Sequence, residues 1–396
     1  MKNVSPDGIR TTCFLLLPAF LLLACTGSGP KKNRQETVSS SAKPIRFLVG
    51  SSDRQREHSI YLCELDPANP EFTLIDSFQG ASGPSYLAVN QEGTRLYAID
   101  NTVSDPETGE HSVTSFRIER DPFLLEVLNR RSSMGRGPCH LSLNSEGTYL
   151  FVANYSSGHT AAYPIGEDGG IMEASAVVRG NGSGPVESRQ RSPHAHQAVL
   201  DPLERYLLVP DLGADRVFIY EFNRELGSLE KNPLQEGFPL EPGSGPRHLD
   251  FHPSGDLVFI VNELNSTVTS CRYDRSAGIL TGVETLSTVG PDTEPGYPAA
   301  IRSHPSGNAL YASTRDDLST LAVFHSDEEG WLTRQQVITV PYWPRDFNMD
   351  PSGRWMLVAG ERSGEIRLYG IDGESGELTD TGISTTLPSP GCILFL

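Results

Sequence analysis

The chain has 396 residues, includes 38 glycines and 29 prolines, and carries a formal net charge of −18 at neutral pH. This excess of acidic side chains argues against a nucleic-acid partner, because phosphate backbones are held by Lys and Arg side chains that displace counterions. The many glycines and prolines are typical of a fold built from short strands and tight turns.

The N-terminal segment differs from the rest of the chain. Lys2 and Arg10 precede an apolar run, Phe14 to Ala24, that is too short to span a bilayer and is typical of a secretory signal. The run ends in the letters LLAC, which resemble the processing box of bacterial lipoproteins, and in that class the cysteine, here Cys25, carries the lipid. An ordinary cleaved signal without lipid is the alternative.

This segment predicts a signal peptide at residues 1–24, lipidation at Cys25 and a flexible polar tether at residues 25–43. The protein is therefore expected to be exported and anchored to the cell envelope, on its periplasmic or surface side, through the N-terminal lipid only. A single domain is expected at residues 44–396. The sequence shows no self-association surface, so we expect a monomer.

Six copies of one pattern fill this domain. Each copy has a proline-led strand, a turn of the Asp/Asn-x-x-Gly kind, an aliphatic strand and an alternating strand that ends near an acidic residue. The copies begin at Pro84, Pro138, Pro193, Pro246, Pro298 and Pro344. Their period of roughly 50 residues is typical of one four-stranded propeller blade per copy.

The fourth copy illustrates the expected strands, which are Arg247–His252, Leu257–Asn262, Thr267–Tyr273 and Leu286–Val289. Three further strands precede the first copy (Phe47–Val49, Ile60–Glu64 and Phe72–Ile75), and one, Cys392–Leu396, follows the last. These four strands predict a seventh blade shared by the two ends of the domain. The expected fold is thus an all-β, seven-bladed β-propeller of four-stranded antiparallel blades, closed by the C-terminal strand.

The cysteines do not suggest disulfides. Cys139 and Cys271 fall in different repeats. Cys63 and Cys392 belong to the third and first strands of the closing blade, about 9 to 10 Å apart at a strand spacing of ~4.8 Å, which is beyond disulfide reach. We expect four buried free thiols in the domain.

Unusual polar residues gather at two places in each repeat, the start of the first strand and the end of the second. These places lie at the same end of an antiparallel blade, so the residues are expected to line one mouth of the central channel. They are Asp100, Asn101, Cys139, His140, Asn154, Tyr155, His194, His196, Asp211, Arg247, His248, Asn262, Glu263, Thr314, Arg315, Arg345, Asp346 and Glu361.

Several of these residues also have a structural interpretation. Histidines at blade starts can bond backbone carbonyls of neighbouring strands. Arg247 and Glu263 can form an ion pair within one blade, and Arg315 can pair with Asp316 or Asp317. Asn154 is as well suited to a turn as to a binding site.

Missing motifs narrow the chemistry. The sequence has no Gly-x-Ser-x-Gly elbow, Walker loop, complete Gly-x-Gly-x-x-Gly, HExxH or CxxC pair, which disfavours a serine hydrolase, a nucleotide enzyme and a structural zinc protein. A metal at His194 and His196 with Asp211 or Glu263 is the weaker interpretation, because the carboxylate clusters typical of calcium sites are missing. No metal and no cofactor are therefore expected.

A family resemblance rests on four segments: SPHAHQAVLDPLERYLLVPDLGADRVFIYEF, GSGPRHLDFHPSGDLVFIVNELNSTVTSCRYD, GRGPCHLSLNSEGTYLFVANYSSG and the closing PSPGCILFL. Together they resemble the seven-bladed lactonase family, which includes a bacterial 6-phosphogluconolactonase and is related to the fungal 3-carboxymuconate lactonizing enzyme. The resemblance covers residues from about 45 to 396. It implies opening or closing of a lactone ring at the channel mouth.

The resemblance also implies roles for single residues. The catalytic histidine of the muconate enzyme falls on His196, its arginine and glutamate fall on Arg247 and Glu263, and a substrate-binding arginine falls on Arg315. Four further mouth residues are assigned to substrate binding: His140, Asn154, His194 and Arg345. The small-molecule partner is then a lactone.

Hydrolysis of a sugar or sugar-acid lactone is the preferred hypothesis, with neutral His196 as general base toward water and Arg247 facing the carbonyl oxygen. A muconate-type cycloisomerase and a non-catalytic envelope-binding propeller are the alternatives. The last repeat departs from the family pattern at Asp346 and Glu361. These carboxylates are expected to disfavour a doubly charged phosphate on the substrate.

Overall fold

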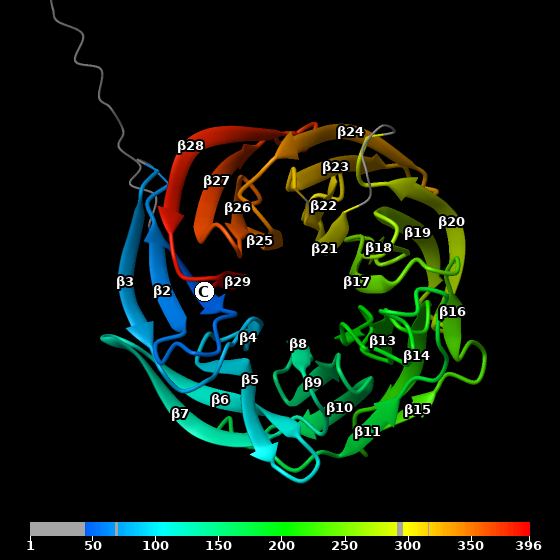
Figure 1. The fold of residues 1–396 in the computed structure, drawn as a ribbon, viewed down its shortest axis with the longest axis horizontal. Helices are drawn as coiled ribbons and strands as arrows, with labels where there is room; N and C mark the ends of the chain where they lie inside the picture. Colours follow the sequence, from blue (N-terminus) through cyan, green and yellow to red (C-terminus); the bar gives the residue numbers. More distant parts are fainter. Residues whose placement is uncertain (1–43, 68–69, 291–295, 316) are drawn as a thin grey trace, which may run out of the picture. The chain divides into compact units, whose positions relative to one another are not determined.

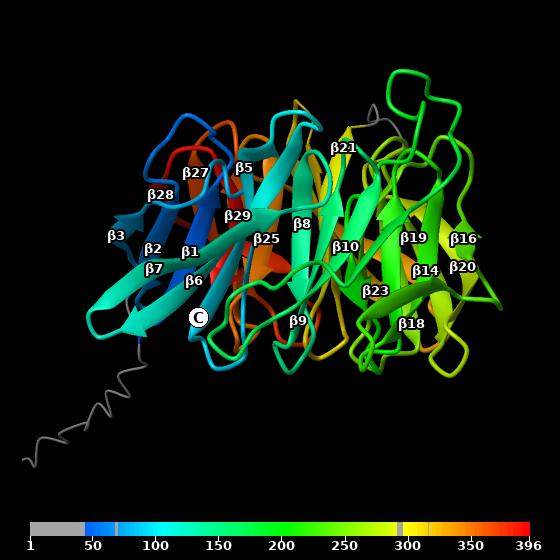
Figure 2. The same ribbon diagram turned by 90° about the horizontal axis from the view of Figure 1, so that it is seen from below.

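The computed structural model describes residues 44–67, 70–290, 296–315 and 317–396. The regular structure of these residues is β-strand, arranged in seven sheets around a common centre (Figure 1). Figure 2 shows the same sheets from the side, with the inner strands running along the axis of the ring. The predicted all-β, seven-bladed propeller is confirmed. The signal at residues 1–24, the tether and Cys25 lie outside the described residues.

Six blades follow the repeats in chain order. Blade 1 comprises β4 (Leu87–Val89), β5 (Arg95–Asp105), β6 (Glu110–Arg120) and β7 (Phe123–Ser132). Blade 2 comprises β8 (Pro138–Leu143), β9 (Tyr149–Asn154), β10 (His159–Pro164) and β11 (Ala176–Arg179). Blade 3 comprises β12 (Val199–Leu200), β13 (Tyr206–Asp211), β14 (Arg216–Asn223), β15 (Ser228–Lys231) and β16 (Gly237–Pro239).

The remaining blades have four strands each. Blade 4 comprises β17 (Pro246–Phe251), β18 (Leu257–Asn262), β19 (Thr267–Asp274) and β20 (Ile279–Ser287). Blade 5 comprises β21 (Tyr297–Ser303), β22 (Leu310–Arg315), β23 (Thr320–Ser326) and β24 (Leu332–Thr339). Blade 6 comprises β25 (Pro344–Met349), β26 (Trp355–Gly360), β27 (Glu365–Ile371) and β28 (Leu378–Thr386). Blade 7 comprises β29 (Pro390–Phe395), β1 (Ile45–Ser51), β2 (Ile60–Leu65) and β3 (Phe72–Phe78).

Blade 7 closes the ring as predicted. Strand β29 pairs antiparallel with β1, with Ile393 opposite Val49 and Cys392 opposite Gly50. The glycine is required, because a Cβ at position 50 would lie 2.0 Å from the carbonyl oxygen of Pro84. Main-chain hydrogen bonds therefore join the two ends of the domain and cover an edge that would otherwise be open.

The apolar core is divided among the interfaces between blades. Each of seven buried clusters combines side chains from two adjacent blades, for example Phe47 of blade 7 with Leu357 of blade 6, and Leu48 of blade 7 with Leu87 of blade 1. Since every blade is packed on both faces, the ring holds its inner strand ends in fixed positions.

Three details differ from the sequence predictions. The fourth strand of blade 4 is Ile279–Ser287, so the prediction of Leu286–Val289 was wrong. This outer strand follows directly on the turn at Gly278, and its half-exposed residues give no continuous apolar run. Blade 3 has a fifth strand, β16, which pairs with β14 beside the predicted four. All four thiols of the domain are free, but Cys139 is only partly buried.

No helix in the described part of the chain is long and apolar enough to cross a membrane.

Deletion of residues 392–396 tests the closure. The deletion removes most of β29, including the buried Cys392 and Ile393, and exposes the inner edge of β1. We expect an insoluble protein, or a melting temperature lower by at least about 10 °C. Thermal unfolding followed by circular dichroism measures the effect. Deletion of Leu396 alone, which lies outside β29, is the control, and equal melting of all three proteins would contradict the closure.

Candidate active site

Strand ends from all seven blades surround one pocket at the mouth of the central channel, which we call the mouth pocket. Its volume is about 400 Å³. Five of the eight predicted site residues line it: His196, Arg247, Glu263, Arg315 and Arg345. The other lining residues are Ser52, Arg54, Gly83, Ser85, Asn101, Gly137, Pro138, Cys139, Tyr155, Ser156, Arg189 and Glu361.

A carboxylate held by three arginines lies in this pocket. Glu263 Oε1 is 2.6 Å from Arg189 Nη2, and Oε2 is 2.8 Å from Arg315 Nη2 and 3.0 Å from Arg247 Nε. Burial on its own would raise the pKa of Glu263, but the charges of Arg315, Arg247 and Arg189 outweigh it and hold that pKa well below the ordinary value. Glu263 is therefore ionised at neutral pH.

The three arginines reach Glu263 from separate parts of the chain. Arg247 is the second residue of β17, and Arg315 is the last residue of β22. The Arg315 side chain is fixed by a hydrogen bond from Nε to the carbonyl oxygen of Tyr297 at 3.0 Å. Burial and the charge of Arg315 lower the pKa of Arg247 to about 9, so its guanidinium still carries charge at neutral pH.

Arg189 was missed by the sequence analysis. It lies in the connection between β11 and blade 3, which is not part of the repeat. Arg189 also donates a hydrogen bond to the hydroxyl of Tyr155 at 3.2 Å. The available signal was the long connection at residues 180–192, which carries Arg189 and Arg191 just ahead of Pro193. Long connections between short elements often serve binding or catalysis.

Aromatic and imidazole rings contact one another in and beside the mouth pocket. The His196 ring lies 5.2 Å from that of Tyr155 and 5.3 Å from that of His248, between ring centroids. Burial, together with the charge of Arg247, holds the pKa of His196 well below the ordinary value. His196 is thus a neutral base at physiological pH. Burial also raises the pKa of the neighbouring Cys139 thiol to about 12, so this cysteine does not supply a thiolate at neutral pH.

Three predicted substrate-binding residues do not line the mouth pocket. His194 stacks on the Tyr155 ring at 4.6 Å, and its Nδ1 lies 2.8 Å from the Tyr155 carbonyl oxygen. Asn154 donates a hydrogen bond to the carbonyl oxygen of Ser133 at 2.8 Å. His140 is buried with its ring 4.2 Å from that of Tyr86. Each of these side chains contacts the protein rather than the pocket.

The mouth pocket carries a net positive charge, although the sequence predicted extra carboxylates at the mouth. Five arginines and two glutamates line it, which leaves an excess of three positive charges. Asp346 is not among the lining residues, since its carboxylate is 2.9 Å from Arg302 and accepts a hydrogen bond from the backbone of Ile393. Glu361 lies 3.6 Å from Arg345. Of the two carboxylates that depart from the family pattern, Glu361 lines the mouth pocket and Asp346 does not, and their expected effect on a doubly charged phosphate stays a prediction.

A metal held by His194 and His196 with Asp211 or Glu263 was the weaker interpretation of the sequence. Within the described ranges, no group of three or more His, Cys, Asp or Glu side chains is placed to hold a metal ion.

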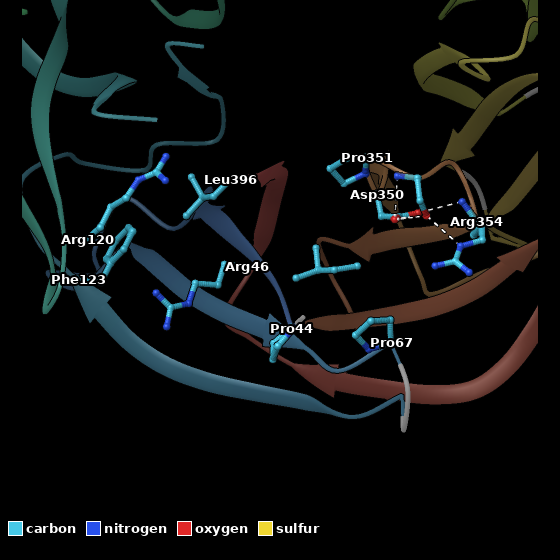
Figure 3. Close-up of a pocket in the computed structure, with 11 residues that line it drawn as sticks. Pro44, Arg46, Pro67, Arg120, Phe123, Asp350, Pro351, Arg354 and Leu396 are labelled. Carbon is cyan, nitrogen blue, oxygen red and sulfur yellow. Dashed lines mark hydrogen bonds between the residues drawn. The ribbon is translucent and has the colours of Figure 1, made fainter. Parts of the chain in front are cut away.

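A second pocket, of about 460 Å³, lies between the ends of blades 6, 7 and 1 that face away from the mouth (Figure 3). Its polar groups serve local structure. Arg46 pairs with Glu64 at 3.2 Å, Arg120 donates to the carbonyl oxygen of Glu92, and the Asp350 carboxylate accepts turn N–H groups such as that of Arg354. In contrast, the mouth pocket brings buried, ionised side chains close together, as is typical of functional sites.

Comparisons with known proteins agree with this fold. Residues 46–395 match the family model described as lactonase, 7-bladed beta-propeller. A 6-phosphogluconolactonase of Bacillus subtilis is 30% identical over 88% of this chain and 97% of its own length. A 6-phosphogluconolactonase of Serratia proteamaculans is 33% identical over 85% of this chain and 94% of its own length.

Solved structures give the same result. The periplasmic gluconolactonase of Pseudomonas aeruginosa is 28% identical with a TM-score of 0.82, covering 89% of this chain and 99% of its own. A Bacteroides fragilis protein is 30% identical with a TM-score of 0.83, covering 90% and 99%. Together, the fold and the mouth pocket define an enzyme of the β-propeller class, with arginines lining the mouth of its central channel. The chain belongs to the seven-bladed β-propeller lactonase family, as the resemblance implied.

Replacement of Glu263 by Gln tests the buried ion cluster. The substitution keeps the shape but leaves three arginines around a neutral group, so we expect the free energy of unfolding at pH 7 to fall by about 3 to 5 kcal/mol. The folded pKa of Glu263 lies below its unfolded value. The carboxylate of Glu263 therefore stabilises the folded protein above about pH 4.3, the ordinary pKa of glutamate, and this stabilisation is lost as the pH falls below that value.

Urea unfolding of both proteins from pH 7 to pH 3 measures this difference, which should shrink toward the acid end. Glu126→Gln is the matched control, because Glu126 forms an exposed pair with Arg117 and its loss should cost less than about 1 kcal/mol. Equal stability of Glu263→Gln and the wild type at pH 7 would show that the cluster does not hold the mouth together.

Proposed function

We propose that the protein hydrolyses the ring ester of a sugar or sugar-acid lactone that carries an acidic group. The observation that supports this most strongly is a neutral, buried imidazole at His196 in a pocket lined by five arginines, within a chain of the lactonase family. A lactone is an activated ester, so one base and cationic donors for the developing oxyanion are sufficient chemistry.

In the proposed reaction, His196 takes a proton from water while the water oxygen attacks the ring carbonyl carbon. The carbonyl oxygen becomes an oxyanion, and the charge of Arg247 or Arg315 stabilises it. When the carbonyl re-forms, the ring C–O bond breaks and the ring oxygen takes the proton back from His196. The product is an open-chain hydroxy acid, which releases a proton at neutral pH.

Glu263 is assigned a positioning role. A carboxylate bound by three guanidinium groups has too low a pKa to serve as a proton acceptor. Its charge allows the buried Arg247 and Arg315 and the partly exposed Arg189 to lie side by side, and it also favours the protonated form of His196 that arises during the reaction.

The positive excess of the mouth pocket supports an acidic substrate. Guanidinium groups bind phosphates and carboxylates through paired hydrogen bonds. The relatives from Bacillus and Serratia are named for a phosphorylated lactone and the Pseudomonas protein for gluconolactone, so a six-carbon aldonolactone is the proposed ring. The lipid anchor at Cys25 would place this activity in the cell envelope, and the periplasmic Pseudomonas protein is consistent with export.

Replacement of His196 by Ala should lower kcat/KM by at least about 100-fold, because the general base is lost. Acid release from glucono-1,5-lactone and its 6-phosphate in a pH-stat measures this, and circular dichroism checks the fold. His325→Ala, at an exposed site where Nδ1 lies 3.1 Å from the carbonyl oxygen of Asn308, is the matched control. Retained activity would reject the assignment.

The wild-type pH profile gives an independent check. Since the pKa of His196 is lowered, the imidazole stays unprotonated below its ordinary value of about 6.5, and kcat/KM should remain level from pH 8 down to about pH 6. A fall centred near pH 6.5 would contradict the proposed environment. Formation of a new ring without acid release would indicate a cycloisomerase instead.

Replacement of Arg345 by Gln tests the selectivity for charge. Arg345 lines the mouth pocket and lies 3.6 Å from Glu361. We expect kcat/KM to fall about tenfold for the 6-phosphate, as for the loss of one charged hydrogen bond, and about twofold at most for the neutral lactone. Arg117→Gln, from an exposed ion pair, is the control. An equal loss on both lactones would mean that Arg345 does not recognise the acidic group.

A further inference from the structure

Aromatic side chains gather on the rim of the mouth pocket between blades 5 and 6. The Trp343 ring lies 6.3 Å from that of Tyr297 and 6.1 Å from that of Tyr342, between centroids. Both tyrosines are exposed, by 46% and 40%, although large apolar rings normally gain by burial. We call Tyr297, Tyr342 and Trp343 the aromatic rim.

The backbone at Trp343 is held in a strained conformation. Its φ is 65°, in the left-handed region that bulky residues avoid. Trp343 directly precedes the proline that opens blade 6, and three other blades have glycine at this place with φ between 53° and 64°: Gly83, Gly137 and Gly245. Blade 7 has Ser389 at this place, with a φ of 42°. A bulky tryptophan in this conformation is a local conflict of the kind that marks functional sites.

The aromatic rim is continuous with the mouth pocket. Arg315, which lines the pocket, donates a hydrogen bond to the carbonyl oxygen of Tyr297, and its guanidinium lies 5.8 Å from the Trp343 ring centroid. Glu361, also in the pocket lining, donates its backbone N–H to the carbonyl oxygen of Trp343 at 3.0 Å. A substituent that projects from a ring bound in the pocket toward blades 5 and 6 would therefore meet the rim.

The rim combines apolar faces with exposed polar groups. The Arg362 guanidinium lies 3.3 Å from the Trp343 ring centroid and is exposed to solvent. Aromatic faces pack against the C–H face of a sugar ring, and a guanidinium and tyrosine hydroxyls offer hydrogen bonds to its hydroxyl groups. This mixture suits a sugar unit better than a purely apolar ligand.

We infer that the aromatic rim is a subsite for a second sugar unit, so that the preferred substrate is the terminal lactone of a disaccharide or longer oligosaccharide. This inference rests on the proposed hydrolysis in the mouth pocket and specifies its substrate class. Binding energy gained on the rim would position the lactone ring against His196 and the arginines.

The test compares glucono-1,5-lactone with cellobiono-1,5-lactone, which differ by one glucosyl unit. The wild type should turn over the disaccharide lactone with a kcat/KM at least tenfold higher, measured by acid release. Trp343→Gly, which introduces the glycine found at this place in blades 1, 2 and 4, and Tyr342→Ala should each lower this ratio at least fivefold. Trp331→Ala is the control, since Trp331 is 54% exposed in a turn at the opposite end of blade 5.

Binding provides a readout without turnover. Tryptophan fluorescence should report binding of cellobionate to the wild type and to Trp331→Ala, with at least tenfold weaker binding by Tyr342→Ala. A wild-type kcat/KM ratio near one, or equal losses on both lactones in the rim variants, would overturn the inference while leaving the proposed hydrolysis intact. Absence of turnover on both lactones with rim-dependent cellobionate binding would instead overturn the proposed hydrolysis.

Discussion

The mouth pocket depends on one interaction, the contact of the Glu263 carboxylate with three guanidinium groups. Arg189, Arg247 and Arg315 come from a connecting segment and from two different blades, and each lies within 3.0 Å of a Glu263 oxygen. Without the carboxylate, three like charges would be held together in a largely buried site, which is unfavourable by several kcal/mol. With it, a positive excess remains in the pocket for an acidic ligand.

The ring makes this arrangement possible. Core clusters between every pair of adjacent blades fix the inner strands, and the pairing of β1 with β29 prevents the ring from opening. Strand starts and strand ends from seven sheets then meet at one mouth, so the side chains of Arg189 and Glu263, 74 residues apart, and of Arg315 and Glu263, 52 residues apart, approach within hydrogen-bond distance. Such a rigid frame reduces the reorganisation needed when charge develops on a substrate.

The repeat made most of this predictable. Its period predicted the number of blades, and its polar strand ends predicted that His196, Arg247, Glu263 and Arg315 lie at one mouth. The repeat could not predict where each side chain points. His140, His194 and Asn154 lie at the predicted end of their blades, but their side chains contact neighbouring protein groups. Arg189 lies in a connection that is not part of the repeat. The left-handed backbone conformation of Trp343 could not be predicted either, because tryptophan rarely adopts it.

The central claim is that this mouth opens a lactone ring with water. Acid release by the purified wild-type protein, followed in a pH-stat with glucono-1,5-lactone 6-phosphate against the spontaneous rate, tests that claim most directly. The account predicts one equivalent of acid per lactone at a rate that saturates with substrate. A folded protein that leaves the spontaneous rate unchanged, on this lactone and on its unphosphorylated and glycosylated forms, would contradict it.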